Sequence, residues 1–328
     1  MVPANFLFFS ILVVGVVLVA SSPSLFISWL GLELNTLMFI PLALGSKSKS
    51  ENEAALKYFL TQTLASAVFL FSSLLSFMDI YFSWGTILLS VALFVKLGVA
   101  PFHAWVPAVS KSISWFSLSI LLTLQKLPPL MILVFSGYNQ LLIWSGVLLS
   151  LLVGAVMGLS QVHTPQMLAY SSIHNMGWFL SSLSLGSYYL WVYFVLYLVT
   201  LLPVIFLLSE LNVGFVNSLS SVGTPMMLSL VLAIGFMSLG GLPPFIGFLP
   251  KWLILQLMMT QGFMLISFAM ILSSLLTLFY YLRVSFSAYL LAKNYWKTSN
   301  SVSTRLSVLS QTMFFLSLMG LPLAGILF

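Results

Sequence analysis

The sequence predicts an all-α polytopic membrane protein, with about eleven transmembrane helices, an inverted-topology repeat and two discontinuous helices. Three observations indicate this fold class: an extreme composition, apolar runs of membrane length, and two matching interruptions rich in proline and glycine. Of the 328 residues, 61% are hydrophobic and only 5% are charged, whereas roughly 25% are charged in an ordinary soluble domain. A soluble fold of this size could not cover its surface with so few charges, so we expect a single transmembrane domain over residues 1–328.

The apolar residues form blocks of about 20, the length that crosses a hydrocarbon core of about 30 Å as a helix. Lipid cannot satisfy free backbone groups, so only helices or a closed barrel can span it, and continuous rather than alternating apolar runs favour helices. The predicted spans are residues 4–20, 24–45, 54–78, 83–108, 112–137, 140–160, 166–186, 188–209, 225–260, 263–291 and 306–327.

The charges of the predicted loops test this number of spans. With eleven alternating spans, every basic loop residue falls on the side of the N-terminus, while the opposite loops contain Asp79 and no Lys or Arg. The positive-inside rule then predicts a cytoplasmic or matrix N-terminus and a C-terminus on the other side. No Lys or Arg precedes Lys47, so neither a secretory signal nor a transit peptide is expected. The basic loop residues are Lys47, Lys49, Lys111, Lys293, Lys297 and Arg305.

The chain contains no cysteine. This excludes thiolate-held iron–sulfur clusters, disulfides and thiol nucleophiles within it. Haem ligation by a histidine pair stays open, with His103, His163 and His174 available. The net charge of +6 is scattered along the chain, without a basic cluster that alternates with aromatic residues, so nucleic-acid binding is not expected.

Residues 98–107, GVAPFHAWVP, align without gaps on residues 241–250, GLPPFIGFLP. The first copy lies in the fourth span and the second in the ninth, so the two broken helices should cross the membrane in opposite directions. This pattern is typical of inverted repeats, whose sites lie at discontinuous helices near mid-membrane. We expect repeat halves at about 4–137 and 140–291, followed by a C-terminal helix at 306–327. Ordinary proline kinks are the alternative explanation.

Four charged residues and one histidine are expected inside spans and away from their ends. Each ionised group at the bilayer centre costs about 2.5–3.5 kcal/mol. Burial disfavours the charged form of such a group, whereas pairing with an opposite charge favours it, so small movements of a partner can switch the charge. That property is what a proton relay needs. The candidates are Glu33, Lys96, Lys126, Lys251 and, with His103 beside the first interruption, His174.

Each candidate also has a structural interpretation. Glu33 and Lys96 could form a static ion pair that joins two helices. The amine of Lys126 could satisfy carbonyls freed by the prolines that follow it, and Lys251 could be an interfacial anchor. The two histidines could be hydrogen-bonded structural residues. Outside the spans, the carboxylates at positions 51 and 53 are expected in a loop, as solvated surface or partner contacts.

Four segments carry a resemblance to a known family: AALKYFLTQ at 54–62, KLGVAPFHAWVP at 96–107, QKLPP at 125–129, and LGGLPPFIGFLPKW at 239–252. They resemble NADH dehydrogenase (ubiquinone) chain 2, the mitochondrially encoded antiporter-like subunits of respiratory complex I. The resemblance implies that Glu33 pairs with Lys96, and that Lys126 and Lys251 continue a hydrated proton path.

The resemblance further implies a proton-translocating subunit of NADH:ubiquinone reductase, driven by electron transfer elsewhere in the complex. No redox chemistry is expected in this chain, and NADH, FMN, iron–sulfur clusters and ubiquinone would belong to partner subunits. The implied partners are other membrane-arm subunits of complex I and the phospholipid bilayer. The implied location is the mitochondrial inner membrane, with the N-terminus in the matrix and the C-terminus in the intermembrane space.

Two other functions stay open at this point. One is a free-standing cation/proton antiporter of the same architecture. The other is a structural membrane subunit whose buried charges only anchor helices.

Overall fold

The computed structural model describes residues 3–45, 48–77, 82–211, 213–216 and 226–292. The predicted span 306–327 lies outside these residues. The same is true of Lys47, Asp79, Lys293, Lys297 and Arg305. The chain divides into two compact units, Met1–Ser150 and Leu151–Phe328.

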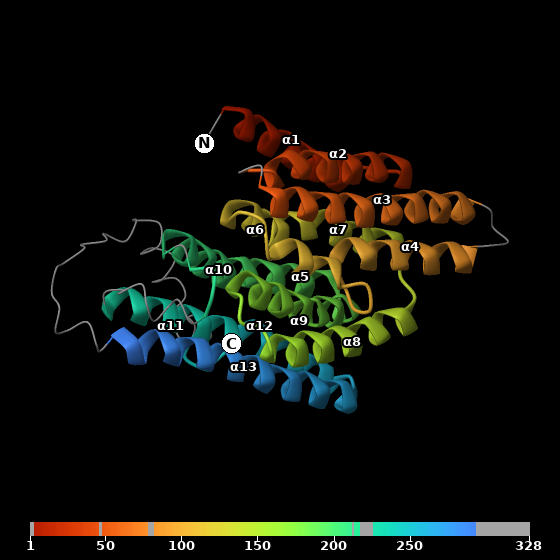
Figure 1. The fold of residues 1–328 in the computed structure, drawn as a ribbon. Helices are drawn as coiled ribbons and strands as arrows, with labels where there is room; N and C mark the ends of the chain where they lie inside the picture. The colour runs from red at the N-terminus through yellow and green to blue at the C-terminus, as the bar shows by residue number, and fades with distance from the viewer. Residues whose placement is uncertain (1–2, 46–47, 78–81, 212, 217–225, 293–328) are drawn as a thin grey trace. The chain divides into compact units, whose positions relative to one another are not determined.

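Within the described residues the fold is helical, and the one β-bridge joins His163 to Phe215. The predicted all-α polytopic membrane class is confirmed, and six helical stretches of the described residues, including Trp115–Ser136 with its internal break, are long and apolar enough to cross a membrane. The helices, drawn in Figure 1, are α1 (Pro3–Ser21), α2 (Leu25–Ala43), α3 (Lys49–Phe77), α4 (Phe82–Leu97), α5 (Trp105–Ser110), α6 (Trp115–Leu122), α7 (Leu127–Ser136), α8 (Gln140–Leu159), α9 (Thr164–Leu185), α10 (Ser187–Leu211), α11 (Met226–Gly240), α12 (Phe248–Thr260) and α13 (Met264–Ala292), with a short 3-10 helix η2 (Leu124–Lys126) between α6 and α7.

Both sequence interruptions are real breaks in helices. The first separates α4 from α5 and the second separates α11 from α12. Gly98 and Gly241, which the gapless alignment pairs, both have a positive φ, of 70° and 81°. Residues with a side chain rarely adopt that conformation, because the Cβ approaches the following carbonyl oxygen. The two glycines therefore end α4 and α11 in the same way.

A third interruption was not predicted from the sequence. The helix expected over 112–137 stops at Thr123, and η2 carries Lys126 before α7 begins. Pro128 and Pro129 occupy the first turn of α7. A proline there loses no helical hydrogen bond, whereas inside a continuous helix it would leave a carbonyl four residues earlier without its donor. A double proline therefore favours a new helix start over a simple kink.

In the first unit, α2 packs against α1, α3 and α7, and α4 packs against α3 and α7 (Figure 1). Glycines let α1 and α2 approach closely, since a Cβ added at Gly31 would lie 2.9 Å from the Gly15 carbonyl oxygen. Small residues at such contacts are a common way to pack helices in a membrane.

The second unit contains the C-terminal half of α8 and the helices from α9 onward. Helix α11 packs against α10 and α13, and α12 packs against α9, α10 and α13. Gly247, at the start of α12, touches the Ser238 carbonyl oxygen of α11 so closely that an added Cβ would collide with it. The two halves of the second broken helix are therefore held against each other at a glycine.

The start of α3 corrects one expectation. Glu51 and Glu53 were predicted in a loop, but α3 begins at Lys49 and includes both. The exposed Glu53 carboxylate pairs with the Lys57 amine one turn later, at 2.6 Å, while Glu51 is buried. Helical spacing of opposite charges favours this extra turn, and the apolar-run criterion cannot detect it.

The contact at Gly247 generates a prediction about assembly. Gly247→Ala should sharply reduce the amount of folded protein in the membrane, because the methyl group has no space beside the Ser238 carbonyl. Gly214→Ala is the control, since nothing lies within 4 Å of a Cβ added at that position. Immunoblotting after native electrophoresis measures both. Equal amounts of the two variants would contradict the close packing of α11 and α12.

Candidate functional site

The first unit encloses a polar cavity beside the first helix break. The space open to water in it is about 10 Å³, close to the minimum of about 10–15 Å³ that holds one water molecule. Helices α2, α3, α4, α5 and α7 and the 3-10 helix η2 all contribute to its wall. The lining residues are Leu32, Asn35, Thr36, Tyr58, Gln62, Lys96, Trp105, Gln125 and Pro129.

Lys96 is the charged residue of this cavity. It lies in the last turn of α4, its side chain is only 5% exposed, and its amine has no hydrogen-bond partner among the described residues. A buried amine without a partner is rare, because burial removes its hydration shell and nothing replaces the lost hydrogen bonds. A cavity of one-water size next to the amine offers the missing partner.

Glu33 lies nearby on α2 and interacts with Lys96 electrostatically. The two side chains form no direct ion pair, because the Lys96 amine has no hydrogen-bond partner among the described residues and no salt bridge joins it to Glu33. The expected contact between Glu33 and Lys96 is therefore absent in this structure. Instead, the Thr36 hydroxyl donates to the Glu33 backbone carbonyl at 2.9 Å and lies 3.3 Å from the Glu33 carboxylate, and Thr36 also lines the cavity. Thr36 thus connects the carboxylate to the space beside Lys96.

A hydrogen-bonded network of neutral side chains forms another part of the cavity wall. The Tyr58 hydroxyl of α3 donates to Gln125 Oε1 at 3.1 Å. The Gln125 amide in turn donates to Asn35 Oδ1 of α2 at 3.3 Å. The network fixes η2 between two continuous helices, directly before Lys126. That lysine is buried, with 4% of its side chain exposed, but it does not line the cavity itself.

At the break after α4, the Val95 carbonyl oxygen accepts from the Gly98 N–H at 3.2 Å, and a tryptophan adds a second donor. The Trp105 indole N–H donates to the Val95 carbonyl oxygen at 2.9 Å, across ten residues of chain. His103 makes the other side-chain contact within this break, between Nδ1 and the Pro101 carbonyl oxygen at 3.2 Å. His103 is partly exposed and is not part of the cavity wall, so this contact matches its structural interpretation.

The second unit has a corresponding cavity at its own break. The space open to water is again about 10 Å³. Lys251 lies on its wall, 7% exposed, and donates to the Gly240 carbonyl oxygen at 2.9 Å. Gly240 is the last residue of α11, where free carbonyls and the helix dipole favour a cation. The lining residues are Asn175, Tyr193, Leu196, Tyr197, Thr200, Leu239, Gly247, Pro250 and Lys251.

His174 lies near this cavity but outside its wall. It is buried in the middle of α9, and its Nε2 is 3.3 Å from the Ser273 hydroxyl of α13. The Trp178 ring stands beside both candidates: the Lys251 amine lies 5.9 Å from its centroid, and the His174 ring 6.5 Å. Lys251 and His174 therefore share an aromatic neighbour.

The two cavities have similar polar groups, which the alignment of 98–107 on 241–250 did not reveal. Each contains one buried lysine, a threonine hydroxyl, at least one tyrosine hydroxyl and at least one side-chain amide. Water held between such groups can accept a proton from a lysine and pass it on. Sequence reasoning missed the neutral members. A usable signal was the set of amides placed inside apolar spans, which are Asn35, Gln62, Gln125 and Asn175.

The residues present do not fit an iron–sulfur cluster. The sequence has no cysteine, and the described residues contain no group of three His, Asp or Glu side chains able to hold a metal ion. Iron–sulfur clusters need thiolates, with histidine as the main replacement. We therefore derive no step that passes through such a group in this chain.

Broken membrane helices with buried lysines at the breaks define the class of antiporter-like membrane subunits. The family described as NADH:quinone oxidoreductase/Mrp antiporter, TM matches residues 22–277. The NADH-ubiquinone oxidoreductase chain 2 of Anopheles gambiae is 34% identical, covering 99% of this chain and 98% of the relative. That of Branchiostoma floridae is 36% identical, covering 97% and 96%. The chain therefore belongs to the NADH-ubiquinone oxidoreductase chain 2 family.

A solved structure supports the same fold. A chain of respiratory complex I from Thermus thermophilus, solved with bound aureothin, superposes with a TM-score of 0.83 at 24% identity. The match covers 98% of this chain and 77% of the bacterial one.

The bond from Trp105 generates a prediction about stability. Trp105→Phe removes the side-chain donor to the Val95 carbonyl and leaves the Gly98 N–H. The variant should be destabilised by about 1 kcal/mol, the usual worth of a single hydrogen bond. Trp84→Phe is the matched control, because Trp84 is 63% exposed. Thermal unfolding of the solubilised protein compares them. A larger shift of the midpoint for Trp84→Phe would show that the indole at 105 does not stabilise the break.

Proposed function

We propose that this chain is a proton-translocating membrane subunit of an NADH:ubiquinone oxidoreductase, and that Glu33, Lys96, Lys126 and Lys251 relay the protons. The observation that carries the proposal is the buried lysine beside a water-sized cavity at each helix break. Membership in the chain 2 family supports the assignment to this complex. His103 and His174 are candidates of second rank, because neither lines a cavity.

In the first unit, the relay would begin with Glu33 and Lys96. The carboxylate acts on the amine through space, and a water in the cavity would bridge the amine to the hydroxyl and amide groups of the wall. Because Gln125 belongs to this wall and Lys126 follows it directly, a proton that leaves Lys96 has its next candidate acceptor on η2. The static ion pair proposed as an alternative has no direct contact to support it.

In the second unit, Lys251 would hold the proton at the end of α11. Its amine contacts one carbonyl, while Tyr193, Tyr197 and Thr200 surround the adjoining space. Burial and an inward-directed bond distinguish it from an exposed interfacial anchor. The site would accommodate both forms of the lysine. The Gly240 carbonyl and water in the cavity would accept hydrogen bonds from the charged ammonium, and the neutral amine would keep the bond to the carbonyl.

The driving force would come from partner subunits. NADH oxidation, FMN, iron–sulfur clusters and ubiquinone would belong to them, since this chain lacks the ligands. The location would be the mitochondrial inner membrane. Lys49 begins α3 and Lys111 follows α5, and the predicted excess of basic loop residues on the side of the N-terminus supports a matrix N-terminus and an intermembrane-space C-terminus. The paired breaks support halves related by inversion, at about 4–137 and 140–291.

A free-standing cation/proton antiporter is the second candidate, because the matching family includes Mrp antiporter subunits by its description. The near-complete coverage of chain 2 relatives favours the complex. Native electrophoresis of solubilised membranes separates the two candidates. We expect the chain to migrate within a large assembly, and migration as a lone 36.3 kDa protein or its dimer would refute that assignment.

The relay predicts the effect of removing one amine. Lys126→Met should lower the number of protons pumped per electron while the complex still assembles, because methionine keeps the length of the buried side chain but cannot bind a proton. Lys57→Met is the control, since the Lys57 amine is half exposed and pairs with Glu53 at the surface. The measurement is proton uptake or release per NADH oxidised in sealed vesicles.

Two outcomes contradict the relay. One is normal proton-to-electron stoichiometry in the assembled Lys126→Met complex, which would leave Lys126 as a structural residue. The other is an equal loss of pumping in Lys57→Met, which would attribute the effect to net charge rather than to position.

A further inference from the structure

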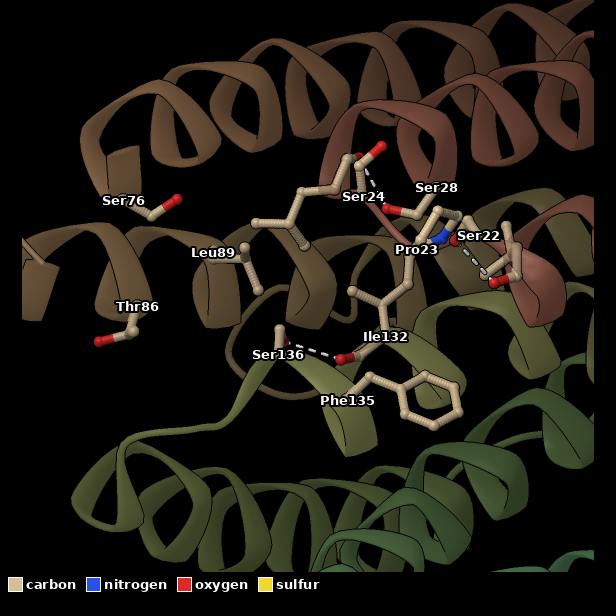
Figure 2. A pocket seen from close by; sticks show the side chains of 12 residues that line it. Ser22, Pro23, Ser24, Ser28, Ser76, Thr86, Leu89, Ile132, Phe135 and Ser136 are labelled. Atoms are coloured by element: carbon tan, nitrogen blue, oxygen red, sulfur yellow. Dashed lines mark hydrogen bonds between the residues drawn. The ribbon is translucent and has the colours of Figure 1, made fainter. Parts of the chain in front are cut away.

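A wide cavity of the first unit lies away from the residues assigned above. It is an open crevice of about 400 Å³, with room for roughly ten water molecules. Figure 2 shows it between the start of α2, the start of α4 and the end of α7. The residues that line it are Val19, Ser22, Pro23, Ser24, Leu25, Ser28, Ser76, Thr86, Leu89, Ile132, Phe135 and Ser136.

The polar groups of this crevice are all neutral hydroxyls, and most of them already use their hydrogen. Ser28 donates to the Leu25 carbonyl at 2.7 Å, Thr86 to Ser83 at 2.9 Å, and Ser136 to Ile132 at 2.7 Å. Ser22 and Ser76 bond in the same way within α1 and α3. Their free lone pairs therefore accept hydrogen bonds. Water can donate hydrogen bonds to these neutral acceptors, so the wall suits water.

The crevice and the Lys96 cavity are bounded by the same four helices, α2, α3, α4 and α7. Along α2, the crevice residue Ser28 precedes the cavity residue Leu32 by one turn, about 6 Å. Along α7, the cavity residue Pro129 lies about 4.5 Å from the crevice residue Ile132. On α4, Leu89 and Lys96 are two turns, about 10 Å, apart. The two spaces therefore follow one another along the helix axes.

Apolar side chains separate the two spaces. Leu32, Leu93 and Ile132 are each no more than 3% exposed. Spacing of three, four or seven residues puts Leu93 on the same face of α4 as Leu89 and Lys96. The barrier is thus one to two helix turns thick along α2, α4 and α7, whereas on α3 the cavity residue Gln62 and the crevice residue Ser76 are about 21 Å apart. Apolar constrictions of this kind close a water path by drying and open it by wetting.

We propose that the crevice is a water-filled vestibule, and that Leu32, Leu93 and Ile132 form the apolar gate between it and Lys96. It opens at the link between α1 and α2, which is the membrane face opposite Lys49 and Lys111. The vestibule would give Lys96 its exchange with the aqueous phase on that face. This role of the gate rests on the proposed proton relay, whereas the presence of water in the crevice does not.

The absence of native cysteine allows a direct test of the water. Ser28→Cys puts a single thiol of this chain in the crevice, and a charged, membrane-impermeant methanethiosulfonate is applied to sealed vesicles of each orientation. We expect labelling from the face opposite the basic loops, about tenfold or more faster than for a thiol in hydrocarbon, where the thiolate does not form. Ser136→Cys is a second variant, in case the first fails to assemble.

Leu64→Cys is the control for labelling, because Leu64 is 69% exposed on α3 and lines neither space. If Ser28→Cys and Ser136→Cys react as slowly as Leu64→Cys, the crevice is filled by lipid or by another chain, and the vestibule is refuted. This result would leave the relay untouched, since it is tested by the stoichiometry of Lys126→Met.

The gate is tested separately. Ile132→Ser should raise the passive proton leak of vesicles without NADH severalfold, because a hydroxyl shortens the dry segment. Leu130→Ser on the same helix is the control: Leu130 is equally buried but lines neither space. Equal leaks in the two variants, or no leak in either, would overturn the gate.

Discussion

One constraint determines most of this structure: a backbone carbonyl inside a membrane must find a hydrogen-bond donor within the protein. At each helix break the chain violates regular helical bonding, and a side chain repairs it. The Trp105 indole gives the Val95 carbonyl a second donor beside the Gly98 N–H at the first break, and the Lys251 ammonium satisfies Gly240 at the second. The groups that repair the breaks are polar and buried, so the functional chemistry gathers where the backbone is irregular.

The same constraint explains why the two units resemble each other in chemistry more than in residue placement. Lys96 precedes its break, whereas Lys251 follows its own. Each nevertheless lies beside a one-water cavity with hydroxyl and amide walls. A helix break leaves backbone groups short of hydrogen-bond partners, and a lysine placed before or after the break can supply an amine there. Gly98 and Gly241 keep the shared backbone conformation, while the lysine positions differ.

Sequence reasoning found the breaks and the lysines because both are violations of a simple rule. Proline and glycine inside an apolar span, and charge at membrane depth, are visible without coordinates. The interruption between α6 and α7 was missed because the apolar run over 112–137 continues through it and hides the new helix start at Pro128 and Pro129. The distance between Glu33 and Lys96, and the network through Gln125, depend on how helices far apart in sequence pack. Serines are too common in these spans for their grouping around the crevice to be noticed.

The unbonded amine of Lys96 has a consequence for how a signal reaches it. The charge state of a lysine held by several hydrogen bonds changes only with local movement, since those bonds must break first. Lys96 has none among the described residues, and its charged neighbour Glu33 acts on it without contact. Its energy therefore depends on the electric field at one point. A charge that changes several ångströms away alters that field at once, so information can cross this part of the protein without any helix having to move.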